Sequence, residues 1–167
     1  VLTRNSTEPM GSSVRIFDLA DGAELVELAS VKTQSSQLMS LLFSPDGMKM
    51  AVGLGDVKVA LFKTDTGHEM SEIESALAGN FTPDSKRIVV GGTSISMRDV
   101  ETGEIAVTFL EVSPPAFNYV AYDPQRGRIA GYRPRGNTRL WDLGAANTFR
   151  TLATSGAQDL VFSPDGL

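Results

Sequence analysis

A short turn motif recurs along the sequence with a nearly constant period. An aromatic residue followed closely by a proline occurs four times, at Phe43, Phe81, Tyr122 and Phe162, and in three copies the turn reads Ser/Thr-Pro-Asp. The spacings between the aromatic residues are 38, 41 and 40 residues. Periods of this length are typical of repeat architectures, in which each repeat is one supersecondary unit packed on the next. The chain is therefore expected to fold as a series of similar units.

Two further markers keep the same phase. The second marker lies 17 to 19 residues after the aromatic residue, at Phe62, Arg98 and Trp141, with Phe17 as a fourth copy. The third marker is a glycine five residues beyond the second, at Gly22, Gly67 and Gly103, whereas the last copy has Gly144 after three. Three markers in phase indicate a true repeat.

The repeat predicts four β-strands per period. Proline pre-sets φ at each turn and Asp and Gly tolerate the remaining backbone angles, so strands enter and leave these points. The flanking segments are short, β-branched or apolar, and bounded by glycine. The expected strands, in the order of the four positions, are residues 38–43, 77–81, 117–122 and 159–162; 48–53, 86–91 and 128–132; 14–17, 57–62, 94–99 and 138–141; and 23–30, 68–74, 104–110 and 145–152.

Two of these segments also have helical spacing of apolar residues. Residues 23–30 and 145–152 alone would pass as short amphipathic helices. They occupy the same place in the repeat as residues 104–110, where Ile105, Val107 and Phe109 alternate as in a strand. We therefore predict strands for both.

The pattern resembles WD-repeat proteins. Four strands every 40 or so residues is the period of a β-propeller blade. The Ser-Pro-Asp-Gly turn, the strand end Leu140-Trp141-Asp142 and the Asp-x-x-Gly region are similar to that family. The Gly-His pair of the family is missing and a tryptophan survives in one copy, so its buried Asp-His-Ser-Trp network is not expected. The resemblance implies an all-β protein, a β-propeller of four-stranded antiparallel blades.

The resemblance covers nearly the whole chain and divides it into blades. Residues 1–11 are expected to be a flexible segment and residues 12–167 a propeller segment. Its parts are a partial blade at 12–30, blades at about 38–74, 77–110 and 117–152, and the start of a further blade at 157–167. We expect an excerpt of a longer propeller, for which seven blades is the common number in the family.

Composition excludes several classes of function. The chain has no cysteine and one histidine, which excludes disulfides, a thiol nucleophile and a cluster of imidazole ligands, and we expect no metal or cofactor. Its formal net charge of −5 argues against nucleic acid as a partner, and no apolar run is long enough to span a membrane. The lack of cysteine and of a visible signal peptide favours a cytoplasmic location.

Basic residues are concentrated in the last full blade. Residues 117–152 hold six arginines against two aspartates, a net of +4 in a chain of net charge −5. By family geometry the loop between the second and third strands opens on the face that binds partners, and here it contains Arg133, Arg135 and Asn137. Arginine forks suit carboxylate or phosphate groups. The connection with Pro114 and Pro115 opens on the same face, and its two prolines make it stiff.

Other candidate residues have plainer interpretations. Gly53-Leu54-Gly55 with Lys58 lies between two expected strands and is predicted to be a hairpin rather than a phosphate loop. His68 is predicted to lie on the surface, and Asp46, Asp84 and Asp165 to be turn residues. The glutamates of the outer strands are explained as charges that discourage pairing with other chains, at Glu24, Glu27, Glu69, Glu72, Glu74 and Glu104.

The sequence thus predicts a non-catalytic interaction scaffold that presents a loop face to a partner protein or to a neighbouring domain. No catalytic constellation emerges. Two alternatives stay open, a propeller enzyme such as a hydrolase or quinone-cofactor dehydrogenase, and a sensor domain of a larger signalling protein. The enzyme would need titratable groups on the innermost strands, which are nearly devoid of them here.

Overall fold

The computed structural model describes residues 14–18, 20–28, 38–54, 58–74, 76–92, 94–111, 119–132, 137–142, 149–152 and 160–163. All regular secondary structure in these residues is β-strand. No helix of the described residues has the length and apolar character needed to cross a membrane. The strands are β1 (Val14–Phe17), β2 (Glu24–Leu28), β3 (Leu38–Phe43), β4 (Lys49–Leu54), β5 (Lys58–Lys63), β6 (Glu69–Glu74), β7 (Ala76–Phe81), β8 (Arg87–Gly92), β9 (Ser94–Asp99), β10 (Ile105–Glu111), β11 (Tyr119–Asp123), β12 (Arg128–Tyr132), β13 (Thr138–Asp142) and β14 (Phe149–Leu152).

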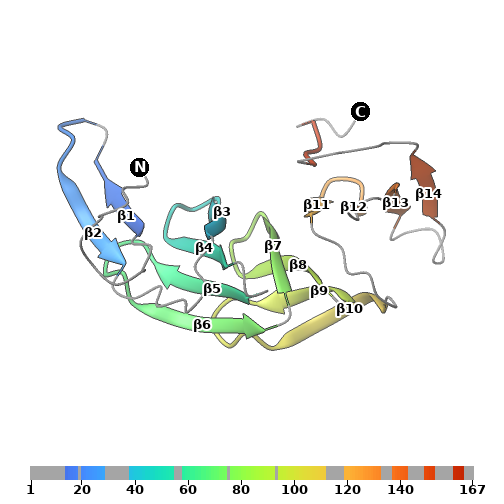
Figure 1. The fold of residues 1–167 in the computed structure, drawn as a ribbon, viewed down its shortest axis with the longest axis horizontal. Helices are drawn as coiled ribbons and strands as arrows, with labels where there is room; N and C mark the ends of the chain where they lie inside the picture. The colour runs from blue at the N-terminus through green and yellow to red at the C-terminus, as the bar shows by residue number, and fades with distance from the viewer. Residues whose placement is uncertain are drawn as a thin grey trace.

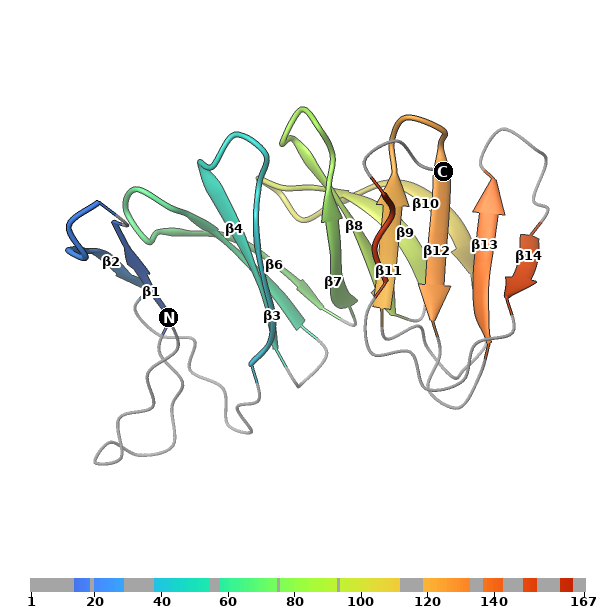
Figure 2. The ribbon, with the colours of Figure 1, turned by 90° about the horizontal axis from the view of Figure 1, so that it is seen from above.

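The strands form three four-stranded antiparallel sheets and one antiparallel pair. Sheet I consists of β3 to β6, sheet II of β7 to β10 and sheet III of β11 to β14, while β1 pairs with β2. Within each sheet every strand pairs with the next one in sequence. Figure 1 shows the sheets following one another around an arc, with β3, β7 and β11 on its inner side and β2, β6, β10 and β14 on its outer rim. The turns after β3, β7 and β11 lie on one face of the arc (Figure 2).

The two segments with helical spacing contain strands where the structure describes them. The prediction of strands in residues 23–30 and 145–152 is confirmed for residues 24–28 and 149–152, which form β2 and β14 and pair with β1 and β13, while residues 29–30 and 145–148 lie outside the described residues. The prediction of a strand ending at Phe162 is wrong for the described residues 160–163, which belong to no strand.

Side-chain hydrogen bonds fix the repeated turns. In sheet I the Ser44 hydroxyl donates to Asp46 Oδ1 at 2.6 Å, and this carboxylate also accepts from the Met48 amide at 2.9 Å. In sheet II Thr82 and Asp84 repeat the first contact, again at 2.6 Å. The prediction that Asp46 and Asp84 are turn residues is confirmed, while Asp165 lies outside the described residues. The hydrogen bonds from Ser44 and Thr82 lower the pKa of Asp46 and Asp84 from the ordinary value of 3.8.

These carboxylates make stability depend on acid pH. A pKa that is lower in the folded state gives a contribution that is complete above the unfolded value of 3.8 and is lost as pH falls through the folded value. We expect the melting temperature to fall with pH below about 4. The double variant Asp46→Asn/Asp84→Asn should show a flatter dependence in thermal unfolding between about pH 2.5 and 5. An unchanged slope in the variant would contradict this role.

Two equivalent turn positions reach the left-handed region of φ with different residues. Gly47 has a φ of 71° and Ser85, its counterpart in sheet II, has a φ of 57°. Glycine adopts this conformation without steric cost, whereas other residues are strained there by about 1–2 kcal/mol. Ser85 is buried, and its Oγ accepts a hydrogen bond of 3.2 Å from the Asp46 amide of sheet I. The side chain therefore links two sheets at the expense of local backbone strain.

The two effects at Ser85 can be separated by two substitutions. Ser85→Ala loses the hydrogen bond and keeps the strain, whereas Ser85→Gly loses the bond and relieves the strain. Because a buried hydrogen bond and a left-handed non-glycine residue are each worth about 1 kcal/mol, Ser85→Gly should be about 1 kcal/mol more stable than Ser85→Ala. Urea unfolding measures the difference. Equal stability of the two variants would show that the backbone at position 85 is unstrained.

The glycine markers close the second turn of each repeat. Gly22, Gly67 and Gly103 have φ values of 72°, 66° and 73°. Each amide donates to the carbonyl of the residue four positions earlier, at 3.0, 2.9 and 2.9 Å. Glycine is required here because the turn needs a positive φ. The periodic glycines in the sequence thus report a repeated backbone geometry.

Apolar cores lie between neighbouring sheets. Val14 of β1 packs with Met50 and Phe62 of sheet I, and Leu61 of sheet I packs with Ile88 of sheet II. A third core joins sheets II and III through Val89, Ile95, Met97, Val120, Ile129 and Trp141. The faces of consecutive sheets are therefore held together by burial of apolar surface.

Equivalent aromatic residues differ in burial. Phe81 is 9 % exposed and belongs to the core between sheets I and II, whereas Phe43 is 57 % exposed. Phe81 has the four strands of sheet I beside it. The sheet that precedes Phe43 contains only β1 and β2 among the described residues. The same repeat position is thus a core position in one sheet and a surface position in the other.

This difference predicts unequal costs for the same truncation. Phe81→Ala should lower the free energy of unfolding by about 3–5 kcal/mol, because it removes buried ring contacts and leaves a cavity. Phe43→Ala should cost less than about 1.5 kcal/mol, since most of that ring already lies in water. Chemical denaturation of the two variants measures both values. A comparable loss for both would mean that Phe43 is covered in solution.

Candidate interaction site

The predicted site residues lie only partly within the described structure. Asn137 is described and exposed, immediately before β13 begins. Arg133, Arg135, Pro114 and Pro115 lie outside the described residues. Their predicted role in partner binding therefore stays a prediction. The structure does describe the strands that flank the loop of Arg133, Arg135 and Asn137.

The flanking strands form a fixed base for this loop. β12 ends at Tyr132 and β13 begins at Thr138, and both residues are buried. Tyr132 is paired with Tyr119 of β11, with ring centroids 6.4 Å apart. Because β12 and β13 are antiparallel, their connection lies at the end of sheet III opposite the turn at Pro124. Five residues, 133–137, bridge two well-packed strand ends.

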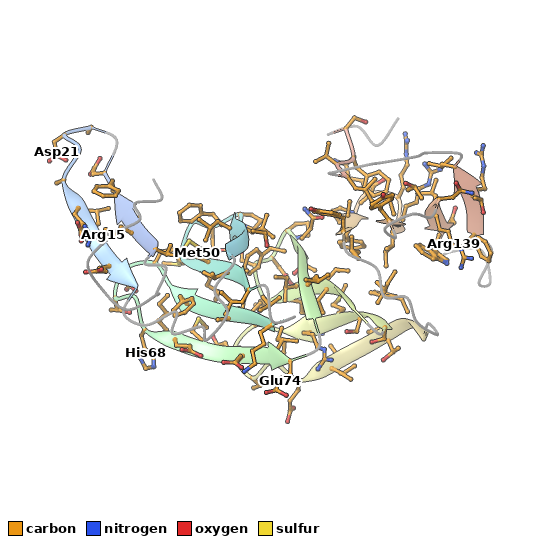
Figure 3. All side chains as sticks on the ribbon, viewed as in Figure 1. Arg15, Asp21, Met50, His68, Glu74 and Arg139 are labelled. Atoms are coloured by element: carbon orange, nitrogen blue, oxygen red, sulfur yellow. The ribbon has the colours of Figure 1, made fainter. Side chains whose placement is uncertain are left out.

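The outer part of sheet III carries a further arginine, Arg139, which is partly buried. The Arg139 guanidinium carbon lies 4.7 Å from the ring centroid of Phe149, and this ring lies 6.3 Å from that of Trp141 (Figure 3). A cation over an exposed aromatic ring is worth about 0.5–1 kcal/mol. Arg139 thus places one of the basic residues expected for this blade on a strand, β13. Phe149 itself remains half exposed.

The sequence did not predict a cleft between the turns of sheets I and II. It has a volume of about 340 Å³ and is lined by Asp46, Gly47, Met48, Lys49, Lys63, Thr64, Asp65, Met70 and Glu101. Lys49 Nζ lies 3.7 Å from Asp46 Oδ2. Charges of both signs surround two methionines. The described residues contain no group of three His, Cys, Asp or Glu side chains placed to hold a metal ion.

Strand register explains why one side of this cleft is basic. Lys49 is paired with Lys63, whereas the equivalent positions in sheet II are Arg87 and Asp99. Opposite charges across a strand pair stabilise it and like charges destabilise it. The substitution of lysine for aspartate after the second repeat marker was the sequence signal for this feature. The effect of this substitution on the charge of the cleft can be seen only when the strand register is known.

The structure confirms the plainer interpretations of two other features. His68 is exposed at the start of β6 and points away from the outer rim (Figure 3). Leu54 of β4 is paired with Lys58 of β5, so the Gly53-Leu54-Gly55 segment connects two antiparallel strands. A phosphate loop would need a helix after the first strand. Lys58 instead forms ion pairs with Glu72 and Glu74.

Comparison with known proteins supports the fold. No protein-family model and no curated protein matches the chain. Among solved structures 655 chains match it. One is BamB from Moraxella catarrhalis, a β-propeller, with a TM-score of 0.62 and 16 % sequence identity. The match covers 83 % of this chain and 45 % of the BamB chain, so this chain spans less than half of that length.

This likeness, at low identity, concerns the fold alone. Sheets I to III are four-stranded antiparallel units arranged as in a propeller, and the predicted all-β propeller fold is confirmed. Membership of the WD-repeat family stays a prediction, since no family model matches. The chain has the fold of a β-propeller.

Proposed function

We propose that the protein is a non-catalytic, WD-repeat-like scaffold that binds an acidic segment of a partner protein, or of a neighbouring domain, through Arg133, Arg135 and Asn137. Pro114 and Pro115, which lie outside the described residues, are the second predicted contact for the partner. The observation that carries the proposal is the buried pair of strand ends, Tyr132 and Thr138, that holds the arginine loop.

A loop held in this way binds at a low entropic cost. The connection has five residues and includes Pro134, which fixes φ at its own position. Binding costs less when the loop and its side chains are ordered before the partner arrives. Arginine forks then match carboxylate groups in bidentate geometry. These features favour recognition of an acidic peptide.

A charge-reversal variant tests the proposal. Arg133→Glu/Arg135→Glu should weaken binding of a fluorescent peptide of alternating Asp and Glu by at least about tenfold at low salt, as each lost pair becomes a repulsive one. Fluorescence anisotropy measures the affinity. Thermal unfolding should be unchanged, because positions 133 and 135 belong to none of the strands.

The matched control is Arg150→Glu, which removes an exposed arginine from β14 of the same sheet. Its affinity for the acidic peptide should stay within about twofold of that of the unmodified protein, as expected for a charge away from the contact. Equal losses in the control and in the double variant would show that net charge alone attracts the peptide. Full binding by a folded double variant would exclude this loop as the site.

A further inference from the structure

The outer strand of sheet II has an unusually apolar free edge. β10 has seven residues, and its neighbour in the sheet is β9 on one side only. Figure 1 shows it on the outer rim of the arc, next in order after β6. Its other edge has no strand partner in the described part of the chain. Such an edge presents unpaired backbone groups that can bind another strand.

The side chains of β10 do not protect this edge. Ile105 is 54 % exposed and Val107 is 41 % exposed. The sequence has no charged residue from 105 to 110. Glu104, predicted to protect the outer strand, precedes Ile105 and therefore lies outside β10. Charged residues within an edge strand are a common defence against pairing, and β10 lacks them over these six positions.

The other outer strands carry such charges. β6 has Glu69, Glu72 and Glu74, and Lys58 of β5 forms ion pairs with the last two. β2 contains Glu24 and Glu27, both within ion-pair distance of Arg15. β14 contains Arg150. β10 has a single charged residue, Glu111 at its C-terminal end, and its residues 105–110 form the longest uncharged stretch among these outer strands.

We propose that the free edge of β10 binds an extended segment of another protein as an additional antiparallel strand. Main-chain hydrogen bonds would give the affinity, as in other cases where a peptide extends a sheet. Apolar side chains of the segment would cover Ile105 and Val107. The register of β10 against β9 skips Ala106 and Phe109, so the ladder is irregular at two positions and the regular stretches of this edge are short.

Charge defines the orientation and the kind of segment. Glu101 and Glu104 are exposed just before β10. An antiparallel partner brings its C-terminal end to these two carboxylates and its N-terminal end to Glu111 alone, so lysine or arginine is favoured at the C-terminal end of the segment. A second copy of β10 would supply no cation, since the sequence has no Lys or Arg from residue 99 to 125. The occupant is therefore a different polypeptide with an apolar, β-prone stretch followed by basic residues.

Two blocked peptides of identical composition test the proposal. The first is acetyl-Thr-Val-Thr-Val-Thr-Lys-Lys-amide, and the second carries the two lysines at its N-terminal end. The first should bind about threefold more tightly at low salt, as expected for exposed ion pairs. It should slow hydrogen exchange in β10 but not in β6 or β14. The first peptide should lose this advantage in Glu101→Gln/Glu104→Gln, which keeps Glu111 at the other end of the strand.

Substitution at the edge separates strand pairing from general attraction. Val107→Lys should lower the affinity for the first peptide by at least about tenfold, because it places a charge against the docked apolar side chain. The matched control Thr151→Lys adds the same charge to the exposed edge strand β14 and should leave binding unchanged. A peptide with methylated backbone amides should fail to bind the unmodified protein, because it cannot form the main-chain hydrogen bonds. This test does not depend on whether the Val107→Lys variant folds.

Three outcomes would overturn the proposal. The first is no protection, or protection of β6 or β14 instead of β10. The second is equal binding of the methylated peptide. The third is protection of β10 that rises with protein concentration when no peptide is present, which would identify a second copy as the occupant. The site differs from the arginine loop, so loss of acidic-peptide binding in Arg133→Glu/Arg135→Glu does not affect this test.

Discussion

Burial of both faces of the middle strands is the constraint on which the rest of the structure depends. In β4 and β8 every residue after the first is buried. An antiparallel sheet usually keeps one face toward water, and these sheets do not. Each therefore needs a neighbour on both sides, and consecutive sheets supply it through shared apolar cores. The exposed positions of the outer strands are free to vary, whereas buried ones such as Ile73 of β6 belong to those cores.

Much of the fold could be predicted because its local chemistry repeats. Turns with Pro and Asp, and glycines that require a positive φ, favour the same backbone geometry in each copy. Features that depend on contacts between copies could not be predicted. The burial of Phe81 and the exposure of Phe43 depend on the number of strands in the preceding sheet. A single repeat does not contain that information.

The candidate sites also differ in whether the sequence alone could point to them. The arginine loop was predictable because six arginines stand out in an otherwise acidic chain. The pairing of Lys49 with Lys63 required the strand register, and the unprotected edge of β10 required the exact start of the strand. In the sequence Glu104 belongs to the same segment as Ile105, whereas in the structure it belongs to the turn.

Contacts between unlike residues also fix the order of the repeats. The Asp46 amide donates to Ser85 Oγ, and the Tyr122 amide donates to Asn80 Oδ1 at 3.1 Å, so different partners join sheets I and II and sheets II and III. Identical repeats could be exchanged, added or removed without loss. Here sheet II has specific hydrogen bonds to sheet I before it and to sheet III after it. The copies have ceased to be interchangeable modules, and shuffling them would give a chain with the same strands but without the bonds that join neighbours.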